Sequence, residues 1–175
     1  GSRGDDAEYM ELLKGEMPQN KENIFESIDT SWNRIQGGKA IGALLQDVEK
    51  NYNFKNPSAS VPDLIKAQKL ISQLPEGHWK KIKSKEISEI IAACAGLYME
   101  AVAEVPYASP GDSIKIKLEV INRSTLPMQL QNVRTSFSGQ NQTTEIKKVL
   151  EYNQRWNQKE SVLLPVNSKY TSTYW

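Results

Sequence analysis

The chain has one histidine and one cysteine among its 175 residues, and these two side chains limit the chemistry that it can perform. His78 stands in a polar connection, and a general base needs an oriented partner and a pocket, which its neighbours in sequence do not supply. We expect His78 to face solvent or to begin a helix. Cys94 falls on an apolar helical stripe, where a buried thiol behaves as a small hydrophobic group, so we expect it in the core. Because a zinc site needs three or four protein ligands, we expect no catalytic residue, metal or other cofactor in this chain.

The charged side chains do not form a recognisable chemical group either. The 22 lysines and arginines nearly balance the 21 aspartates and glutamates, which gives a net charge of +1 and predicts no nucleic-acid partner. A basic run at residues 80–85 is flanked by glutamates, so we interpret it as a solvated helical face. Asp5 and Asp6 are adjacent, but a glycosidase-type pair must be held at a fixed separation by a rigid element, and none is predicted there.

Aromatic residues crowd the last quarter of the chain, at Tyr152, Trp156, Tyr170, Tyr174 and Trp175. Such rings on a β-sandwich can stack on the face of a sugar. They can equally pack a core edge or contact another domain, because tyrosine and tryptophan combine a large apolar body with a polar group. We expect Trp156, Tyr170, Tyr174 and Trp175 to serve mainly in packing or domain contact, with glycan contact as the alternative.

The elements that must position these residues begin with helices. Apolar residues at helical spacing predict helices at about 39–53 and 61–74, and Ser60 with Asp63 resembles a capping box at the start of the second. A third helix is predicted to start near Ser84, and its apolar stripe consists of Ile87, Ile90, Ile91, Cys94, Leu97, Tyr98 and Ala101. As the most apolar of the three, it is expected to be the central helix.

Beyond residue 111 the hydrophobic period changes from helical spacing to strict alternation. Residues 114–120 alternate between apolar and charged side chains, which predicts a half-buried strand that ends at Asn122. A second strand at 128–137 changes phase, so we expect a bulge near Asn132. A turn at 138–141 and further strands at 145–150 and 161–166 complete the pattern. It predicts four or five short antiparallel strands.

Together these elements predict an α+β fold, with about three helices followed by a partial antiparallel β-sandwich. We divide the chain into a linker at 1–38, a helical domain at 39–105 and a sandwich-like domain at 106–175, with the boundary at the proline-rich and glycine-containing stretch 106–111. We expect the sandwich to be truncated at the C-terminus, because residues 169–175 have strand-like composition without a polar tail. No apolar stretch is long enough to cross a bilayer.

Several short motifs then point to a family. They are Leu12–Glu16, Ile28–Trp32, Gly37–Gly38, Ile91–Ala101, Pro110–Asp112 and Ile121–Ser124. In this order they resemble the region that follows the catalytic domain in large LmbE/PIG-L-like deacetylases of Bacteroidetes-type bacteria, over most of residues 9–175. In that family a Rossmann-like domain removes the N-acetyl group from an N-acetylglucosamine derivative with a zinc ion held by an Ala-His-Pro-Asp-Asp motif and a later histidine. That motif is absent here, since Asp5 and Asp6 lack the preceding His-Pro.

The resemblance therefore implies hydrolase activity, and zinc, for a parent protein and not for this segment. It implies a non-catalytic accessory segment that positions domains or contacts glycan, with the parent's catalytic domain as partner and carbohydrate as a second one. It also implies an extracytoplasmic location. The alternative is a stand-alone protein-interaction or scaffold domain unrelated to carbohydrate.

Overall fold

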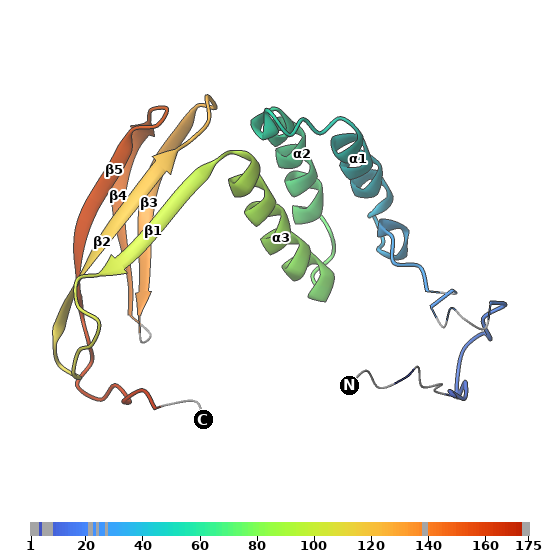
Figure 1. The fold of residues 1–175 in the computed structure, drawn as a ribbon, viewed down its shortest axis with the longest axis horizontal. Helices are drawn as coiled ribbons and strands as arrows, with labels where there is room; N and C mark the ends of the chain where they lie inside the picture. The colour runs from blue at the N-terminus through green and yellow to red at the C-terminus, as the bar shows by residue number, and fades with distance from the viewer. Residues whose placement is uncertain are drawn as a thin grey trace.

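The computed structural model describes residues 4, 9–20, 23, 25–26, 28–137 and 140–172. Three helices are followed by five antiparallel strands in two small sheets (Figure 1), so the predicted α+β fold is confirmed. Before the short 3₁₀ helix η1 (Trp32–Arg34), the described residues form turns and irregular chain only.

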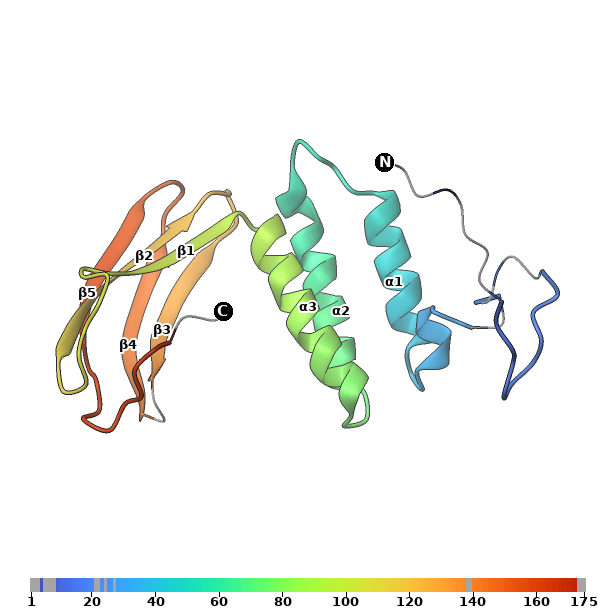
Figure 2. The same cartoon turned by 60° about the horizontal axis from the view of Figure 1, so that its bottom comes forward.

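The helical region is built around its middle helix. The helices are α1 (Lys39–Lys50), α2 (Val61–Ser72) and α3 (His78–Cys94), and their shared core consists of Ile41, Leu64, Ala67, Ile71, Leu74 and Ile87. In Figures 1 and 2, α2 lies between α1 and α3. The expectation that the third helix is central is therefore wrong. The first half of α3 is rich in lysine, and Ile87 is its only buried residue, whereas Ile90 is 47% exposed.

The start of α2 also differs from the prediction. A 3₁₀ turn, η2 (Pro57–Ser60), leads directly into the helix, so Ser60 already has helical backbone angles and its side chain makes no capping hydrogen bond. The predicted capping box is wrong, because a capping side chain needs an extended residue that can fold back over the first turn.

The third helix starts and ends earlier than its apolar stripe predicts. It begins at His78 and stops at Cys94, and residues Leu97–Ala103 form the strand β1. Gly96 separates the two elements with a φ of +63°, a left-handed conformation that ends helices and that glycine adopts at little cost. Leu97, Tyr98 and Ala101 were expected on the helix, so that part of the prediction is wrong.

The strands form a three-stranded sheet of order β1–β2–β5 and a two-stranded sheet, β3–β4. Their bounds are Ser113–Asn122 (β2), Met128–Phe137 (β3), Gln140–Leu150 (β4) and Arg155–Leu163 (β5). The register of β3 against β4 shifts between Leu130 and Asn132, which confirms the predicted bulge. β5 begins earlier than the strand predicted at 161–166, and Gln140 and Asn141 belong to β4 and not to a turn. The other two residues of that turn, Ser138 and Gly139, lie outside the described residues.

One buried asparagine holds the two sheets together at the end of β2. Asn122 is 1% exposed, and its amide Nδ2 donates to the carbonyl oxygens of Leu126 at 2.9 Å and Leu150 at 3.1 Å. Its Oδ1 accepts hydrogen bonds from the backbone N–H and the hydroxyl of Ser124. The side chain thus satisfies the turn after β2 and the last carbonyl of β4 at once.

Candidate docking groove between the two sheets

The single histidine lies on the surface at the first residue of α3. His78 meets the ring of Trp79 edge to face, with centroids 5.3 Å apart, and the guanidinium of Arg34 lies 4.1 Å above the Trp79 ring. No carboxylate is hydrogen-bonded to the imidazole in the part of the chain that the structure describes. His78 therefore begins a helix, as expected, and nothing described there orients it for proton transfer.

The single cysteine is half-buried and packs against the helical core beside Ile91. Its position agrees with the expected structural role, although Cys94 lies at the edge of the core and not within it. Lys55 and Arg123 line the same pocket as Cys94, and among the described contacts neither forms a hydrogen bond with its thiol.

Three of the four lysines in the basic run are paired with the glutamates that flank it. The Nζ atoms lie 2.6 Å from a carboxylate oxygen in Lys80–Glu76, 2.7 Å in Lys83–Glu86 and 3.7 Å in Lys85–Glu89. All three pairs are one helical turn apart, which makes this part of α3 an ion-paired face and not a phosphate site. Asp5 and Asp6 lie outside the described residues.

The described residues lack both a metal-ligand cluster and a membrane-spanning helix. They hold no cluster of three or more histidine, cysteine, aspartate or glutamate side chains that could bind a metal ion. In the same residues, no helix is both long and apolar enough to span a membrane.

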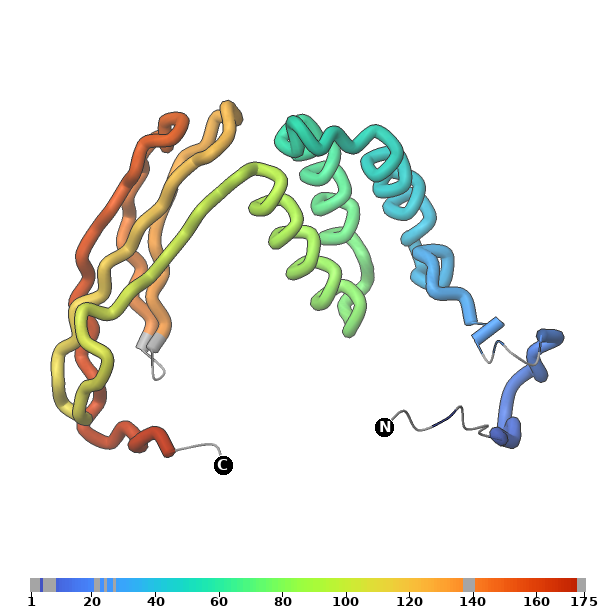
Figure 3. Tube along the Cα trace, viewed as in Figure 1, coloured from blue at the N-terminus to red at the C-terminus, as the bar shows by residue number. Residues whose placement is uncertain are grey.

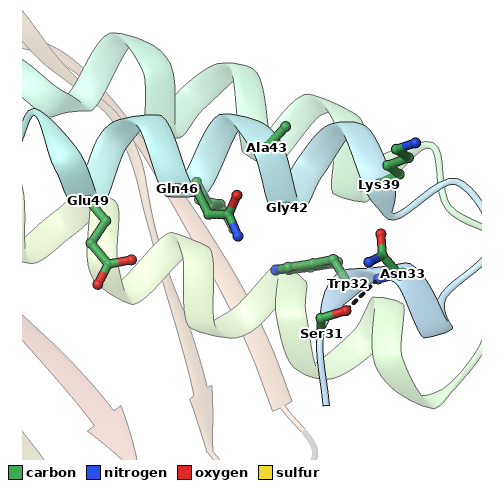
Figure 4. A pocket seen from close by; sticks show the side chains of 9 residues that line it. Ser31, Trp32, Asn33, Lys39, Gly42, Ala43, Gln46 and Glu49 are labelled. Carbon is green, nitrogen blue, oxygen red and sulfur yellow. Dashed lines mark hydrogen bonds between the residues drawn. The ribbon is translucent and has the colours of Figure 1, made fainter. Parts of the chain in front are cut away.

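Another pocket lies beside α1, and Figure 4 shows the polar side chains that line it. Its volume is ≈ 480 Å³, and the indole of Trp32 forms one wall below Gly42. The charged residues Lys39 and Glu49 lie at opposite ends of the pocket. Ten residues of helix separate them by about 15 Å, so they cannot act on the same atom of a ligand.

The site with the clearest physical character is an apolar groove of ≈ 360 Å³ on the inner face of the sandwich. It is lined by β1, β2, β3 and the indole of Trp156 from β5. Met99, Val120 and Trp156 form one row across the three strands of the larger sheet, because Met99 pairs with Val120 and Val120 pairs with Trp156. Leu130 and Val133 of β3 form the opposite wall.

The middle of this row is covered, and its end at Met99 is open. Val120 and Leu118 are only 6% and 8% exposed, whereas Met99 is 63% exposed. The difference follows from the number of strands, since the smaller sheet has two and the larger has three. β3 reaches over β2, and no described strand lies beside β3 to cover β1.

The outer face of the same sheet carries charged side chains that pair with one another. Glu104 Oε1 lies 2.6 Å from Lys159 Nζ, and this hydrogen bond lowers the pKa of the Glu104 carboxyl. Glu119 accepts a 3.1 Å contact from Arg155. A hydrogen bond to Glu100 raises the pKa of the Tyr98 hydroxyl. The inner face is apolar and the outer face is charged. The inner face, which carries the groove, is therefore the one that favours burial.

The structure separates the aromatic residues that the sequence grouped together. Trp156 is half-buried in the groove, while Tyr170 is 80% exposed on the irregular segment after β5. Tyr152, on the connection before β5, is 57% exposed. Tyr174 and Trp175 lie outside the described residues.

Sequence reasoning missed the β1 side of the groove because it assigned residues 97–101 to a helix. Leu97, Met99, Ala101 and Ala103 alternate with Tyr98, Glu100 and Val102, which is also a strand pattern. The signal that decides between the two is Gly96, since a glycine directly after an apolar helical run favours helix termination.

Comparison with known proteins adds no assignment. No protein family, curated protein or solved structure matches the chain.

Proposed function

We propose that this chain is a non-catalytic accessory segment, and that the groove between the sheets is a docking surface that holds polypeptide from outside the five strands in place. The observation that carries the proposal is the apolar row Met99–Val120–Trp156, which is covered at Val120 and open at Met99. A continuous apolar face beside an unpaired strand edge is a surface on which protein docks.

The resemblance to the post-catalytic region of LmbE/PIG-L-like deacetylases supports placing this surface within a larger protein. In such a parent, zinc and the hydrolytic residues belong to the catalytic domain, and the present segment positions it. The described residues support this division of roles, because their chemical groups are dispersed or paired with counter-ions.

The proposal predicts that the isolated chain does not hydrolyse an N-acetylglucosamine derivative and binds no stoichiometric zinc. The parent protein with Met99→Lys should be cut by a protease within this segment about tenfold faster than the wild type, because a charge cannot be buried in the groove. Val102→Lys, on the solvated outer face of the same strand, is the matched control and should leave the cleavage rate unchanged.

Hydrolysis by the purified chain would contradict the accessory role. Equal cleavage rates for the wild type and both variants would contradict the docking role of the groove. If the groove instead takes a strand from a separate protein, the chain is a stand-alone interaction domain, and the cleavage rates will depend on that partner's concentration.

Glycan contact is the second candidate, and it depends on Trp156. The ring is half-buried in a row of apolar side chains, so a sugar would have to displace packed neighbours. We therefore expect no change in Trp fluorescence or amide shifts up to millimolar N-acetylglucosamine oligomer. Saturable micromolar binding that Trp156→Ala abolishes without loss of the fold would establish the glycan role.

A further inference from the structure

The open groove borders the free edge of β3. Within the described residues β3 pairs only with β4, so its other edge presents unpaired backbone N–H and C=O groups. That edge lies on the β1 side, because the groove is lined by β1 and β3 and by no residue of β4. An extended strand added there would complete the backbone hydrogen bonds of β3 and cover Met99 and Ala101 in one step.

A second copy of the chain does not fit this position. Antiparallel pairing of two β3 strands about a two-fold axis would place both larger sheets on the same side of the joined sheet. The strand β1 that projects beyond β3 in one copy would then occupy the space of the other copy's larger sheet. The occupant must be a single strand without a sheet attached beneath it.

The segment that follows β5 is in the right place and runs in the right direction. Leu164 is held at the lower end of the larger sheet by two backbone hydrogen bonds, from its N–H to Asp112 and from the N–H of Gly111 to its carbonyl. In Figures 1 and 3 the red segment then crosses below the sandwich toward the side of β3. A strand rising from there runs antiparallel to β3, which descends toward this end. Such a return is usual in Greek-key sandwiches.

The sequence of this segment has the alternation that the groove requires. From residue 169 it reads Lys-Tyr-Thr-Ser-Thr-Tyr-Trp. Tyr170, Ser172 and Tyr174 fall on one side of an extended chain, and three of the four remaining residues are polar. Tyr170 is 80% exposed, so its ring is available for burial. Seven residues in extended form span about 23 Å, enough to pass the groove wall on β3.

We propose that the segment beginning at Lys169 adds to the free edge of β3 as an antiparallel strand and covers the open face of β1. This inference rests on the proposed function, because it names the polypeptide that the groove receives. Trp156 and Tyr170 would then belong to one apolar cluster, which extends the row of Met99, Val120 and Trp156.

The test compares the full chain with a chain that ends at Ser168, by hydrogen exchange at the amides of residues 130–136. In the full chain, the alternate β3 amides that point away from β4 should exchange about tenfold more slowly than in the shortened chain. Met99→Lys in the full chain should speed exchange at these β3 amides as the deletion does. Val102→Lys should leave their exchange rates unchanged. A spin label at Tyr170→Cys, in a Cys94→Ser background, should broaden the methyl signal of Ala101.

Identical exchange in both chains together with an unbroadened Ala101 signal would overturn the proposal. Protection that rises with protein concentration would also overturn it, in favour of a second copy or an intermolecular exchange of the segment. If Met99→Lys increases proteolysis of the parent protein while the deletion leaves β3 unaffected, the docking function stands and only the identity of the occupant is wrong. If neither measurement responds to Met99→Lys, both proposals fail.

Discussion

At the scale of single residues, the side chain with the largest structural role is polar. Asn122 is almost completely buried, and its two polar atoms serve both the turn after β2 and the end of β4. Its removal leaves two carbonyl oxygens and one N–H without their partner in a site that water does not reach. We expect Asn122→Ala to lower the free energy of unfolding by about 2–4 kcal/mol. Urea denaturation measures the loss, and the exposed Asn157→Ala should change it by less than about 0.5 kcal/mol.

A second prediction at this scale concerns pH. The hydrogen bond from Lys159 lowers the pKa of Glu104 below its ordinary value of 4.5. A carboxylate with a depressed pKa in the folded state stabilises the fold above the pKa of the unfolded chain, and this contribution is lost as the pH falls through the folded value. Lys159→Met should return the Glu104 pKa toward 4.5 in an NMR titration and remove that part of the acid sensitivity. Lys148→Met, on the other sheet, is the control, and an unchanged Glu104 titration in Lys159→Met would contradict the pairing.

At the scale of elements, the junction between α3 and β1 depends on one backbone conformation. Gly96 has a φ of +63°, and a Cβ atom added there would lie 3.3 Å from the Cβ of Arg123. Both effects are unfavourable, so we expect Gly96→Ala to reduce stability by about 1–2 kcal/mol. Gly77→Ala is a matched control in front of the same helix, because Gly77 has an extended φ of 164° and nothing within 4 Å of the added atom. Equal thermal midpoints for the two variants would contradict this role for Gly96.

The sequence predicted some of the strands correctly and missed others. The alternation in β2 and the phase change in β3 follow from which side chains face the core, and both were predictable. β1 was missed, because its seven residues have apolar groups at both helical and alternating spacing, and only the preceding Gly96 favours the strand. The start of β5 was not predicted, for another reason. Gln158 and Glu160 share the inward phase of Trp156 and are hydrogen-bonded to each other at 2.5 Å, so the strand lacks an apolar pattern there.

The groove itself could not have been derived from the sequence. Trp156 was singled out by its residue type, but its neighbours Met99 and Leu130 come from strands that are distant in the chain. Which of them share a row depends on strand order and register, and which remain uncovered depends on the number of strands in the opposing sheet. These are properties of the tertiary topology and not of any local pattern.

At the scale of the whole molecule, the helical core and the sandwich are built from separate sets of residues. The helical cluster contains Ile71 at 1% exposed, and no strand contributes to that cluster among the described residues. We expect Ile71→Ala to cost about 2–5 kcal/mol within the helical region. Hydrogen exchange should accelerate in α1, α2 and α3 but not in β2. Equal acceleration in both regions would show that they unfold as one unit.

The short junction at Gly96 also has a mechanical consequence. Only Ala95 and Gly96 lie between the end of α3 and the start of β1, and the Gly96 carbonyl accepts a 2.9 Å hydrogen bond from the N–H of Arg123. α3 has 17 residues, so it is a rigid rod about 25 Å long that is attached to the sandwich through Gly96. A rotation of ten degrees at Gly96 would move its far end by about 4 Å, on that length. The backbone conformation of Ala95 and Gly96 thus sets the orientation of the helices, and of any polypeptide attached to them, relative to the sandwich.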